Sequence, residues 1–524
     1  MKTRSERLQA LCDAPPLDLV VVGGGATGAG VALDAAARGY AVALLEADDF
    51  AKGTSSRATK LVHGGVRYLA QGQLGLVREA LRERRTLLAN APHLASPLRF
   101  VLPAYRPWQV PFFGLGLMAY DLLAGRSALG RTRWLGRTAT QKALPGVNPN
   151  GLWGGIQYWD AQFDDARLAL ALARSAERAG ALVLNHCPVE GLRWQADKVA
   201  GVVAVEAETG SRLTLNTRCV INATGVWVDD LRERDHQGRP PEPLVTVSQG
   251  VHLVVDRQFL PSEQALLVPK TEDGRVLFAV PWMGRVILGT TDTPRRDKPL
   301  EPQAFDEEIE FILREAGRVL VHPPGRSDVL SVWAGLRPLA RPNSGPGNPT
   351  GTGGISREHH IEVRPSGLVS VTGGKWTTYR AMAEDVLSAC MAGGWLDRRP
   401  GGVTAQWPLV GAQPLQRPLH QIQGLARYGS EIEQVQSLPG ADRWLHPELS
   451  EAMVRFAARW EMARTVEDVL ARRVRLLFLD ARAALAVAEP VADLLREETG
   501  VDPQLDAFRA LAHGYCLTDT VAPE

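Results

Sequence analysis

Cysteine, net charge and long apolar runs are all scarce in this 524-residue sequence. The five cysteines are scattered and none forms a close pair, which argues against a disulfide framework and a cysteine-ligated zinc site. The formal net charge is +1, so no overall field attracts nucleic acid, and no basic stripe with interleaved aromatic residues takes its place. The sequence therefore predicts a reduced protein without a metal site or a nucleic-acid partner.

No segment contains about 18 uninterrupted apolar residues, so a membrane-spanning helix is not expected. The first residues, "MKTRSERLQALCDAPP", are polar and lack the apolar core of a secretory signal, which favours a cytoplasmic location. A hydrophobic fraction of 45% with 22% charged residues is typical of a folded globular protein, and the length predicts two or three domains.

A nucleotide-binding unit begins at the short apolar run "DLVVV". Gly23, Gly25 and Gly28 form GxGxxG between this predicted strand and a helix, where glycines allow a tight turn, close approach of a pyrophosphate and helix packing. Glu46 ends the next predicted strand, at the place where an acid binds ribose hydroxyls. A glycine-rich turn without a ligand is the alternative, and the unit alone does not separate NAD from FAD.

Two later segments favour FAD. "CVINATGVW" is an apolar strand that opens into small residues, which let the chain pass close to a cofactor. "VSVTGGKWTTYR" sets paired glycines before a helix whose positive end can stabilise charge on a reduced flavin. Each segment alone could be an ordinary buried strand and turn, but together they indicate FAD.

The pattern of apolar and turn-forming residues along the chain predicts an α/β plus α fold with a Rossmann-like domain, an antiparallel sheet and a helical C-terminal domain. We expect a discontinuous FAD-binding domain over 1–105, 155–245 and 340–395. The other expected segments are an interfacial insertion, a substrate-binding antiparallel layer and an all-helical domain: 106–154, 246–339 and 400–524.

Seven segments in order, among them "VVVGGGATGAG", "TSSRATKLVHGGVRYL", "NATGVWV", "AGLRPL" and "GGKWTTYRAMAED", resemble the FAD-dependent glycerol-3-phosphate dehydrogenases over about residues 17–385. The resemblance implies oxidation of sn-glycerol 3-phosphate to dihydroxyacetone phosphate, with electrons passing through FAD to ubiquinone or menaquinone. It also implies peripheral, monotopic attachment to the inner face of the cytoplasmic membrane, and a homodimer is a further expected partner state.

The same resemblance assigns site residues. Arg67, Tyr68, Arg337 and Lys375 are expected to bind the substrate, since cations suit a phosphate and arginine bonds its oxygens in pairs. The residues expected at the cofactor, with the glycine motif and its acid, are Gly23, Gly25, Gly28, Glu46, Thr54, Ser55, His63, Gly64, Gly65, Gly225, Gly374, Lys375 and Thr377.

Three residues are expected to be catalytic: His252, Arg337 and Lys375. His252 is favoured as proton acceptor because an ordinary imidazole pKa of about 6.5 suits base chemistry near neutrality. His63 and an arginine are the competitors, and His252 could instead be a strand histidine satisfied in the core. Asp164 and Asp165 form a tempting carboxylate pair, but an aspartate directly before a helical segment favours a helix cap.

Residues 110–120 form an apolar run that is too short to span a membrane but suits an interfacial segment. Five arginines flank this run against a single aspartate within 106–137, and Trp108 and Trp134 are candidate interface anchors. A buried helix between domains is the alternative.

Three other functions compete with the dehydrogenase. A soluble glycerol-3-phosphate oxidase would pass the electrons to oxygen, but such an enzyme does not require the apolar segment 110–120. A flavin amine or amino-acid oxidase would share the fold, but arginines with a lysine fit a dianionic phosphate better than one carboxylate. A nucleotide sensor without catalysis would not require the basic residues beside the cofactor motifs.

Overall fold

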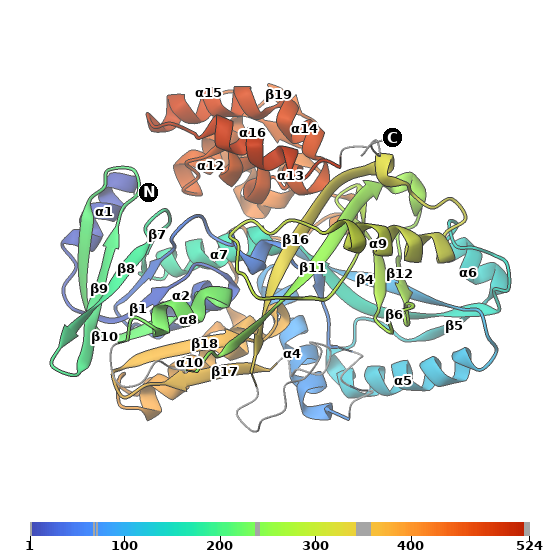
Figure 1. The fold of residues 1–524 in the computed structure, drawn as a ribbon, viewed down its shortest axis with the longest axis horizontal. Helices are drawn as coiled ribbons and strands as arrows, with labels where there is room; N and C mark the ends of the chain where they lie inside the picture. Colours follow the sequence, from blue (N-terminus) through green and yellow to red (C-terminus); the bar gives the residue numbers. More distant parts are fainter. Residues whose placement is uncertain (1–2, 66–68, 70–71, 236–241, 342–357, 518–524) are drawn as a thin grey trace.

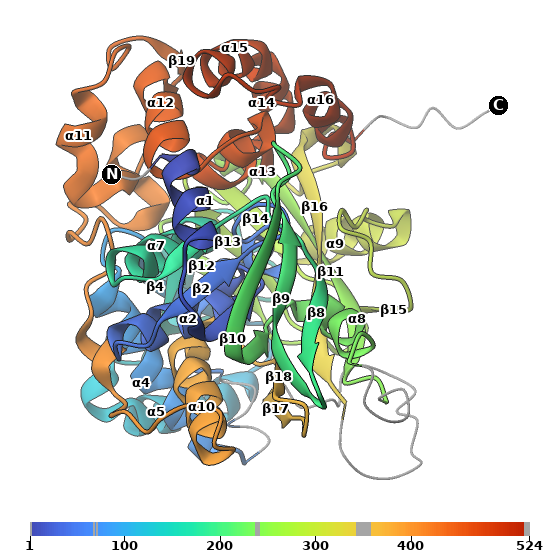
Figure 2. The same cartoon turned by 90° about the vertical axis from the view of Figure 1, so that its left-hand side faces the viewer.

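The computed structural model describes residues 3–65, 69, 72–235, 242–341 and 358–517. Two sheets lie side by side, and a cluster of C-terminal helices covers one end of both (Figures 1 and 2). This arrangement confirms the predicted combination of an α/β domain, a second sheet and a helical domain.

The first sheet is the nucleotide-binding one, with strand order β17-β18-β10-β1-β2-β7. The five strands from β18 to β7 run parallel, β17 is antiparallel to β18, and a hairpin, β8–β9, extends β10. The strands are β1 (Leu17–Val22), β2 (Val42–Leu45), β7 (Leu182–Leu184), β8 (Val189–Gln195), β9 (Lys198–Val205), β10 (Arg212–Asn222), β17 (His359–Val363) and β18 (Leu368–Gly373).

Both faces of this sheet are covered, which explains why β1 and β2 read as continuous apolar runs. Helices α2 (Ala26–Ala37), α7 (Asp165–Arg178) and α10 (Tyr379–Ala392) pack on one face. Helix α1 (Arg4–Cys12) and the hairpin cover the other.

The second sheet has ten strands in the order β15-β11-β14-β13-β12-β4-β6-β3, with β16 beside β11 and β5 beside β6. Most of its pairs are antiparallel. The strands are β3 (Leu61–Val62), β4 (Ala95–Ala104), β5 (Arg133–Gly136), β6 (Gly154–Phe163), β11 (Val245–Asp256), β12 (Ala265–Val268), β13 (Leu277–Trp282), β14 (Arg285–Gly289), β15 (Thr293–Arg295) and β16 (Val329–Ala340).

This sheet membership corrects the predicted ranges. β3 and β4 lie within 1–105, and most of β6 lies within 155–245, yet all three strands belong to the second sheet. β4 and β6 pair along their whole lengths, from Ala95 opposite Phe163 to Ala104 opposite Gly154. A strand's own residues do not reveal which sheet it joins, so the predicted ranges place these three strands with the domain that is nearest in the sequence.

The C-terminal domain is helical, as predicted, and its core is continuous with side chains of the second sheet, among them Val254, Trp282, Ile287 and Trp333. Its main elements are α11 (Ile432–Gln436), α12 (Glu451–Trp460), the π-helix η11 (Asp468–Arg473), α13 (Leu476–Leu479), α14 (Ala481–Ala486), α15 (Ala488–Thr499) and α16 (Leu505–His513). A short hairpin joins β19 (Trp444–His446) to β20 (Leu449–Ser450).

The remaining α-helices of the described residues are α4 (Leu74–Asn90), α5 (Gln109–Ala124), α6 (Arg137–Ala143), α8 (Val228–Arg232) and α9 (Asp306–Val319). Helix α5 contains the apolar segment 110–120 and lies at the opposite end of the molecule from the C-terminal helices (Figures 1 and 2). Within the described ranges, no helix has both the length and the apolarity required to cross a bilayer.

Candidate active site

A cavity of about 420 Å³ opens where the parallel strands of the first sheet end. The carboxyl ends of β1, β10 and β18 are neighbours there, which is where open α/β sheets bind their ligands. Eight of the residues predicted to bind the cofactor line the cavity: Gly23, Gly25, Glu46, Thr54, Ser55, Gly225, Gly374 and Lys375.

The turn from β1 into α2 requires its glycines. Gly23 has a φ of +109°, and a Cβ there would lie 2.6 Å from the Ala223 carbonyl oxygen. Gly28 sits inside α2, where a Cβ would lie 1.9 Å from the Gly23 carbonyl oxygen. Gly25 caps α2 without a side-chain acceptor, so the amino end of the helix faces the cavity as an anion site. This cradle suits the pyrophosphate of a dinucleotide.

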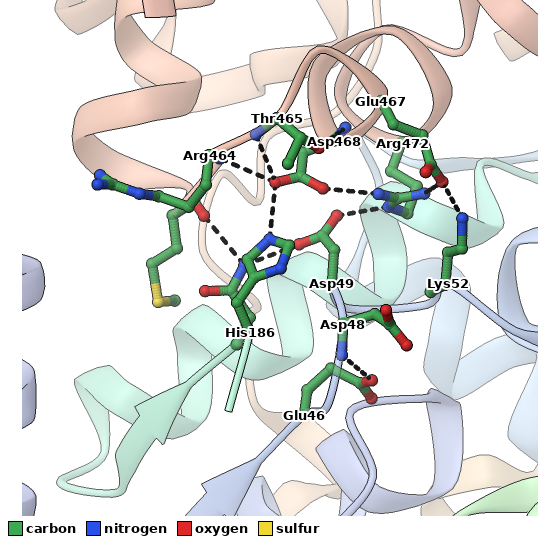
Figure 3. Close-up of polar contacts among 12 residues, drawn as sticks. Glu46, Asp48, Asp49, Lys52, His186, Arg464, Thr465, Glu467, Asp468 and Arg472 are labelled. Carbon is green, nitrogen blue, oxygen red and sulfur yellow. Dashed lines mark hydrogen bonds and ion pairs between the residues drawn. The ribbon is translucent and has the colours of Figure 1, made fainter. Parts of the chain in front are cut away.

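Glu46 lies at the end of β2 and lines the cavity (Figure 3). Its carboxylate accepts hydrogen bonds from the amides of Gly24 at 2.5 Å and Asp48 at 3.0 Å. Burial raises the pKa of Glu46 to about 7, although those two amides favour the charged form. The carboxylate is therefore held at the position where a ribose hydroxyl would meet it.

Thr54 and Ser55 belong to the short 3₁₀-helix η1 (Thr54–Ser56) and line the cavity, and the Ser55 carbonyl oxygen accepts a hydrogen bond from the Trp376 indole at 2.9 Å. The Ser55 hydroxyl accepts the first amide of α2, from Ala26, at 2.9 Å. The Thr54 hydroxyl donates to the Leu336 carbonyl oxygen of β16 at 2.6 Å. This segment thus connects the nucleotide-binding helix with the second sheet.

The "KLVHGG" stretch follows η1 and does not line the cavity. The His63 amide and carbonyl both lie 3.3 Å from the Thr377 hydroxyl. A Cβ on Gly64 would lie 2.4 Å from the Tyr120 hydroxyl oxygen, and Gly65 has a φ of +78°. The paired glycines therefore bring the backbone close to its neighbours, while Arg67 and Tyr68 lie outside the described residues.

Arg337 projects from β16 over Gly250 of the adjacent strand β11, where a Cβ would lie 2.0 Å from Nη2. The guanidinium donates to the Thr291 carbonyl oxygen at 3.0 Å and to the Thr290 hydroxyl at 2.9 Å. It also pairs with Asp292 at 3.3 Å. Pro338, the next residue of β16, lines the cavity, whereas Arg337 itself is not among the lining residues.

His252 lies two residues along β11 from Gly250, on the same face. The ring stacks on Trp333 with centroids 4.2 Å apart, and Nε2 lies 2.9 Å from the Thr59 hydroxyl. Nδ1 is buried and has no hydrogen-bond partner among the described residues. Burial lowers the pKa of His252 well below its ordinary value, and Arg337 and Lys60 add to this effect, so the imidazole is neutral.

Lys375 follows the turn at Gly373 and Gly374, both of which have positive φ, and lines the cavity just before η7 (Trp376–Thr378) and α10. Gly225, with a φ of +64°, lines it after β10. The structure thus gathers the predicted "NATG" and "GGK" segments at one end of one sheet.

Asp164 caps α7, as predicted, by accepting the Arg167 amide at 3.3 Å. Asp165 is fully buried and bonds Lys60 at 2.7 Å and Arg475 at 3.2 Å. Burial lowers the pKa of Lys60 to about 7, against the opposing effect of Asp165. The two carboxylates therefore serve capping and ion pairing behind the site.

The sequence did not predict the residues that surround the side chains of Arg337 and His252. Gly250 and Gly289 admit the side chains of Arg337 and His252, and Thr290 with Asp292 anchors Arg337. Residues 289–292, "GTTD", supply three of these four residues, and the sequence alone assigns no role to them.

These features define an FAD-dependent oxidoreductase. The chain matches the family described as "FAD dependent oxidoreductase" over residues 18–386, and "C-terminal domain of alpha-glycerophosphate oxidase" over residues 402–505. A glycerol-3-phosphate dehydrogenase structure from Bacillus halodurans, complexed with FAD, is 30% identical with a TM-score of 0.77, and the alignment covers 98% of each chain.

Curated relatives agree. A probable mitochondrial glycerol-3-phosphate dehydrogenase of Caenorhabditis elegans is 40% identical, covering 95% of this chain and 73% of the relative. The mitochondrial glycerol-3-phosphate dehydrogenase of Homo sapiens is 38% identical with the same coverage. The chain belongs to the FAD-dependent glycerol-3-phosphate dehydrogenase family, and FAD is its cofactor.

Proposed function

We propose that the protein oxidises sn-glycerol 3-phosphate to dihydroxyacetone phosphate and passes the electrons to ubiquinone or menaquinone at a membrane surface. The observation that carries this proposal is a fixed guanidinium, Arg337, close enough to a buried neutral imidazole, His252, to help lower its pKa, on a strand whose next residue, Pro338, lines the cofactor cavity. Oxidation of a secondary alcohol that carries a phosphate needs one group for the proton and cations for the phosphate.

The cofactor would be held by the turn of Gly23 and Gly25 at its pyrophosphate and by Glu46 at a ribose. When bound, FAD supplies the hydride acceptor. Lys375, which lines the cavity, would place a second positive charge near the substrate. Arg67 and Tyr68 remain predicted substrate contacts.

Arg337 would bind the phosphate. Its contacts to Thr290, Thr291 and Asp292 fix the guanidinium before substrate arrives, so little side-chain entropy is lost on binding. A planar donor pair held in this way favours a phosphate oxygen pair over a single hydroxyl.

His252 would take the hydroxyl proton. Because Nε2 is bonded to Thr59, Nδ1 is the nitrogen left to receive it. Arg337 helps to hold the pKa of this histidine down, so a phosphate dianion bound to Arg337 would cancel part of that effect and make the imidazole a better base when substrate is present.

The test is anaerobic bleaching of the flavin absorbance of the purified protein by glycerol 3-phosphate, with glycerol and an amino-acid mixture as controls. We expect bleaching by the phosphate ester alone, and an Arg337→Met variant that needs at least about tenfold more substrate, from loss of a charge-assisted hydrogen bond. Bleaching by amino acids instead would establish the amine-oxidase alternative.

The proposed membrane contact is made by α5. Five large apolar side chains around this helix are mostly exposed, the largest fraction being 83% at Leu122: Trp108, Phe112, Leu115, Met118 and Leu122. Exposed arginines flank the helix at 106, 126, 131, 133 and 137. An apolar face with a basic border is suited to the interface of an anionic membrane.

Electron delivery separates the dehydrogenase from the oxidase alternative. Turnover with a quinone and without hydrogen peroxide supports the proposal, whereas stoichiometric peroxide in air would establish the oxidase. The cytoplasmic location and the homodimer stay predictions.

A further inference from the structure

The loop of residues 47–57, hereafter the cofactor loop, follows Glu46 and forms one wall of the cofactor cavity. Asp48, Ala51, Lys52, Thr54 and Ser55 of this loop line the cavity directly. Its other side faces η11 and neighbouring residues of the C-terminal domain (Figure 3).

Asp49 is the most deeply anchored residue of the cofactor loop and is fully buried. Its carboxylate accepts hydrogen bonds from Arg472 at 2.5 Å and from Arg473 at 2.5 and 2.9 Å. Asn185 of the nucleotide-binding domain donates to it at 3.0 Å. Two consecutive arginines reach one carboxylate because they lie on a π-helix turn, a geometry that is frequent at functional sites.

Lys52 extends this connection to the cavity wall. Its ammonium pairs with Glu467 of the C-terminal domain and lies 3.5 Å from Glu301. Glu467 also accepts a hydrogen bond from Arg472 at 2.6 Å. One glutamate therefore joins the cavity-lining lysine to the arginine that holds Asp49.

Two further contacts hold the end of the cofactor loop. Arg475 donates to the Ser56 carbonyl oxygen at 2.7 Å. Arg57 forms a double hydrogen bond with Glu301, at 2.9 and 2.7 Å, and Glu301 also accepts the Tyr515 hydroxyl at 2.7 Å. The C-terminal domain thus contacts the cofactor loop near its beginning, middle and end.

We propose that the C-terminal helical domain is a clamp on the cofactor loop and thereby sets how tightly the protein retains FAD. Glu467, Arg472 and Arg473 are positioning residues in this proposal, since they act on the cofactor through Asp49 and Lys52. Charged groups from a second domain thus contribute to fixing the course of this loop. The proposal depends on FAD as cofactor but not on the identity of the substrate.

The first test compares two glutamates of the C-terminal domain that each pair with the nucleotide-binding domain. Glu467→Gln removes the charge that holds Lys52 and Arg472. Glu431→Gln is the matched control, because Glu431 bonds Arg174 of α7 at 2.7 and 2.6 Å and does not touch the cofactor loop. The side chains of both glutamates are partly exposed, 21% and 15%, which favours folding of both variants.

The measurement is FAD binding to full-length protein freed of flavin, together with the melting temperature of each apoprotein. We expect Glu467→Gln to raise the FAD dissociation constant about tenfold, as for loss of a charge-assisted hydrogen bond, and Glu431→Gln to leave it unchanged. Equal FAD affinity in the two variants, or weakening that simply follows apoprotein melting temperature, would overturn the proposal.

A second measurement needs no substitution. Coupling between two sites is reciprocal, so FAD bound at the cavity must stabilise the clamp. We expect slower amide hydrogen exchange over residues 465–475 of the wild-type protein with FAD than without it. Identical exchange of this segment in both states would overturn the proposal even if Glu467→Gln does not fold.

Discussion

Membrane binding through α5 can be tested by removing three of its exposed apolar side chains while keeping its basic border. In the triple variant Phe112→Ser, Leu115→Ser, Leu122→Ser, three side chains with exposed fractions of 65%, 69% and 83% become polar. Leu117 and Tyr120, which face the protein, are left in place. The variant should therefore fold and bind FAD normally.

The expected magnitude follows from the exposed fractions. Full burial of an apolar side chain of this size is worth about 1.5–3 kcal/mol. Since 65% or more of each residue is open to a membrane, each contributes about 1–2 kcal/mol and the three together about 3–6 kcal/mol. The partition coefficient onto vesicles should fall by about two to four orders of magnitude.

The assay is co-sedimentation with vesicles that contain anionic lipid, at low and high salt. The arginines remain in the variant, so we expect weak residual binding that high salt abolishes, because surface charge is screened. Trp444→Ser is the control, since Trp444 is 47% exposed on the C-terminal domain, far from α5. Undiminished vesicle binding by the triple variant, or an equal loss in the control, would refute the reasoning.

Three further predictions concern the site and its clamp. Gly23→Ala should weaken FAD binding by about tenfold or more in a flavin titration, because positive φ costs an alanine about 1–2 kcal/mol and the Cβ meets the Ala223 carbonyl oxygen. His252→Ala should lower the turnover number far more than it weakens flavin affinity, and near-normal turnover would remove this histidine from the mechanism. Burial opposes protonation of His186, but the negative charges of Asp468 and Asp49 outweigh burial and raise the pKa of this histidine. The ion pair of protonated His186 with Asp468 therefore contributes its full stability below about pH 6.5, and this stability is lost as the pH rises through the raised pKa. Melting temperatures measured across this pH range should fall in the wild type and not in His186→Gln, which tests whether the His186–Asp468 pair causes the loss of stability.

Features that depend on neighbouring residues in the sequence could be predicted. The turn at Gly23 needs a positive φ whatever surrounds it, and Asp164 caps α7 through an amide three residues away. The nucleotide-binding unit and the helical character of the C-terminal domain are local in the same sense. These predictions are confirmed because the physics that determines them is contained in short segments.

Features that arise between distant segments could not be predicted from one sequence. Glycine is required at position 250 because the Arg337 guanidinium of another strand occupies the space of a Cβ there, and the residues next to Gly250 in the sequence do not indicate this contact. Likewise the ten-residue pairing of β4 with β6 assigns both strands to the second sheet, although their residues are equally suited to the first. The Asp49 contacts with Arg472 and Arg473 join residues more than 400 positions apart.

The segment that follows β2 explains why the cofactor motif and the "HGG" stretch are so close in the sequence. Within a few residues it supplies Lys52 to the cavity wall, Ser55 to the first amide of α2, Thr59 to His252, and then β3 to the second sheet. Arginines of the C-terminal domain donate hydrogen bonds to the same segment at the Asp49 carboxylate and at the Ser56 carbonyl oxygen. One short stretch therefore contacts the cofactor cavity, the proposed base and all three structural units. We expect a displacement of this stretch at the clamp to change the contact between Thr59 and His252 as well as the affinity for FAD.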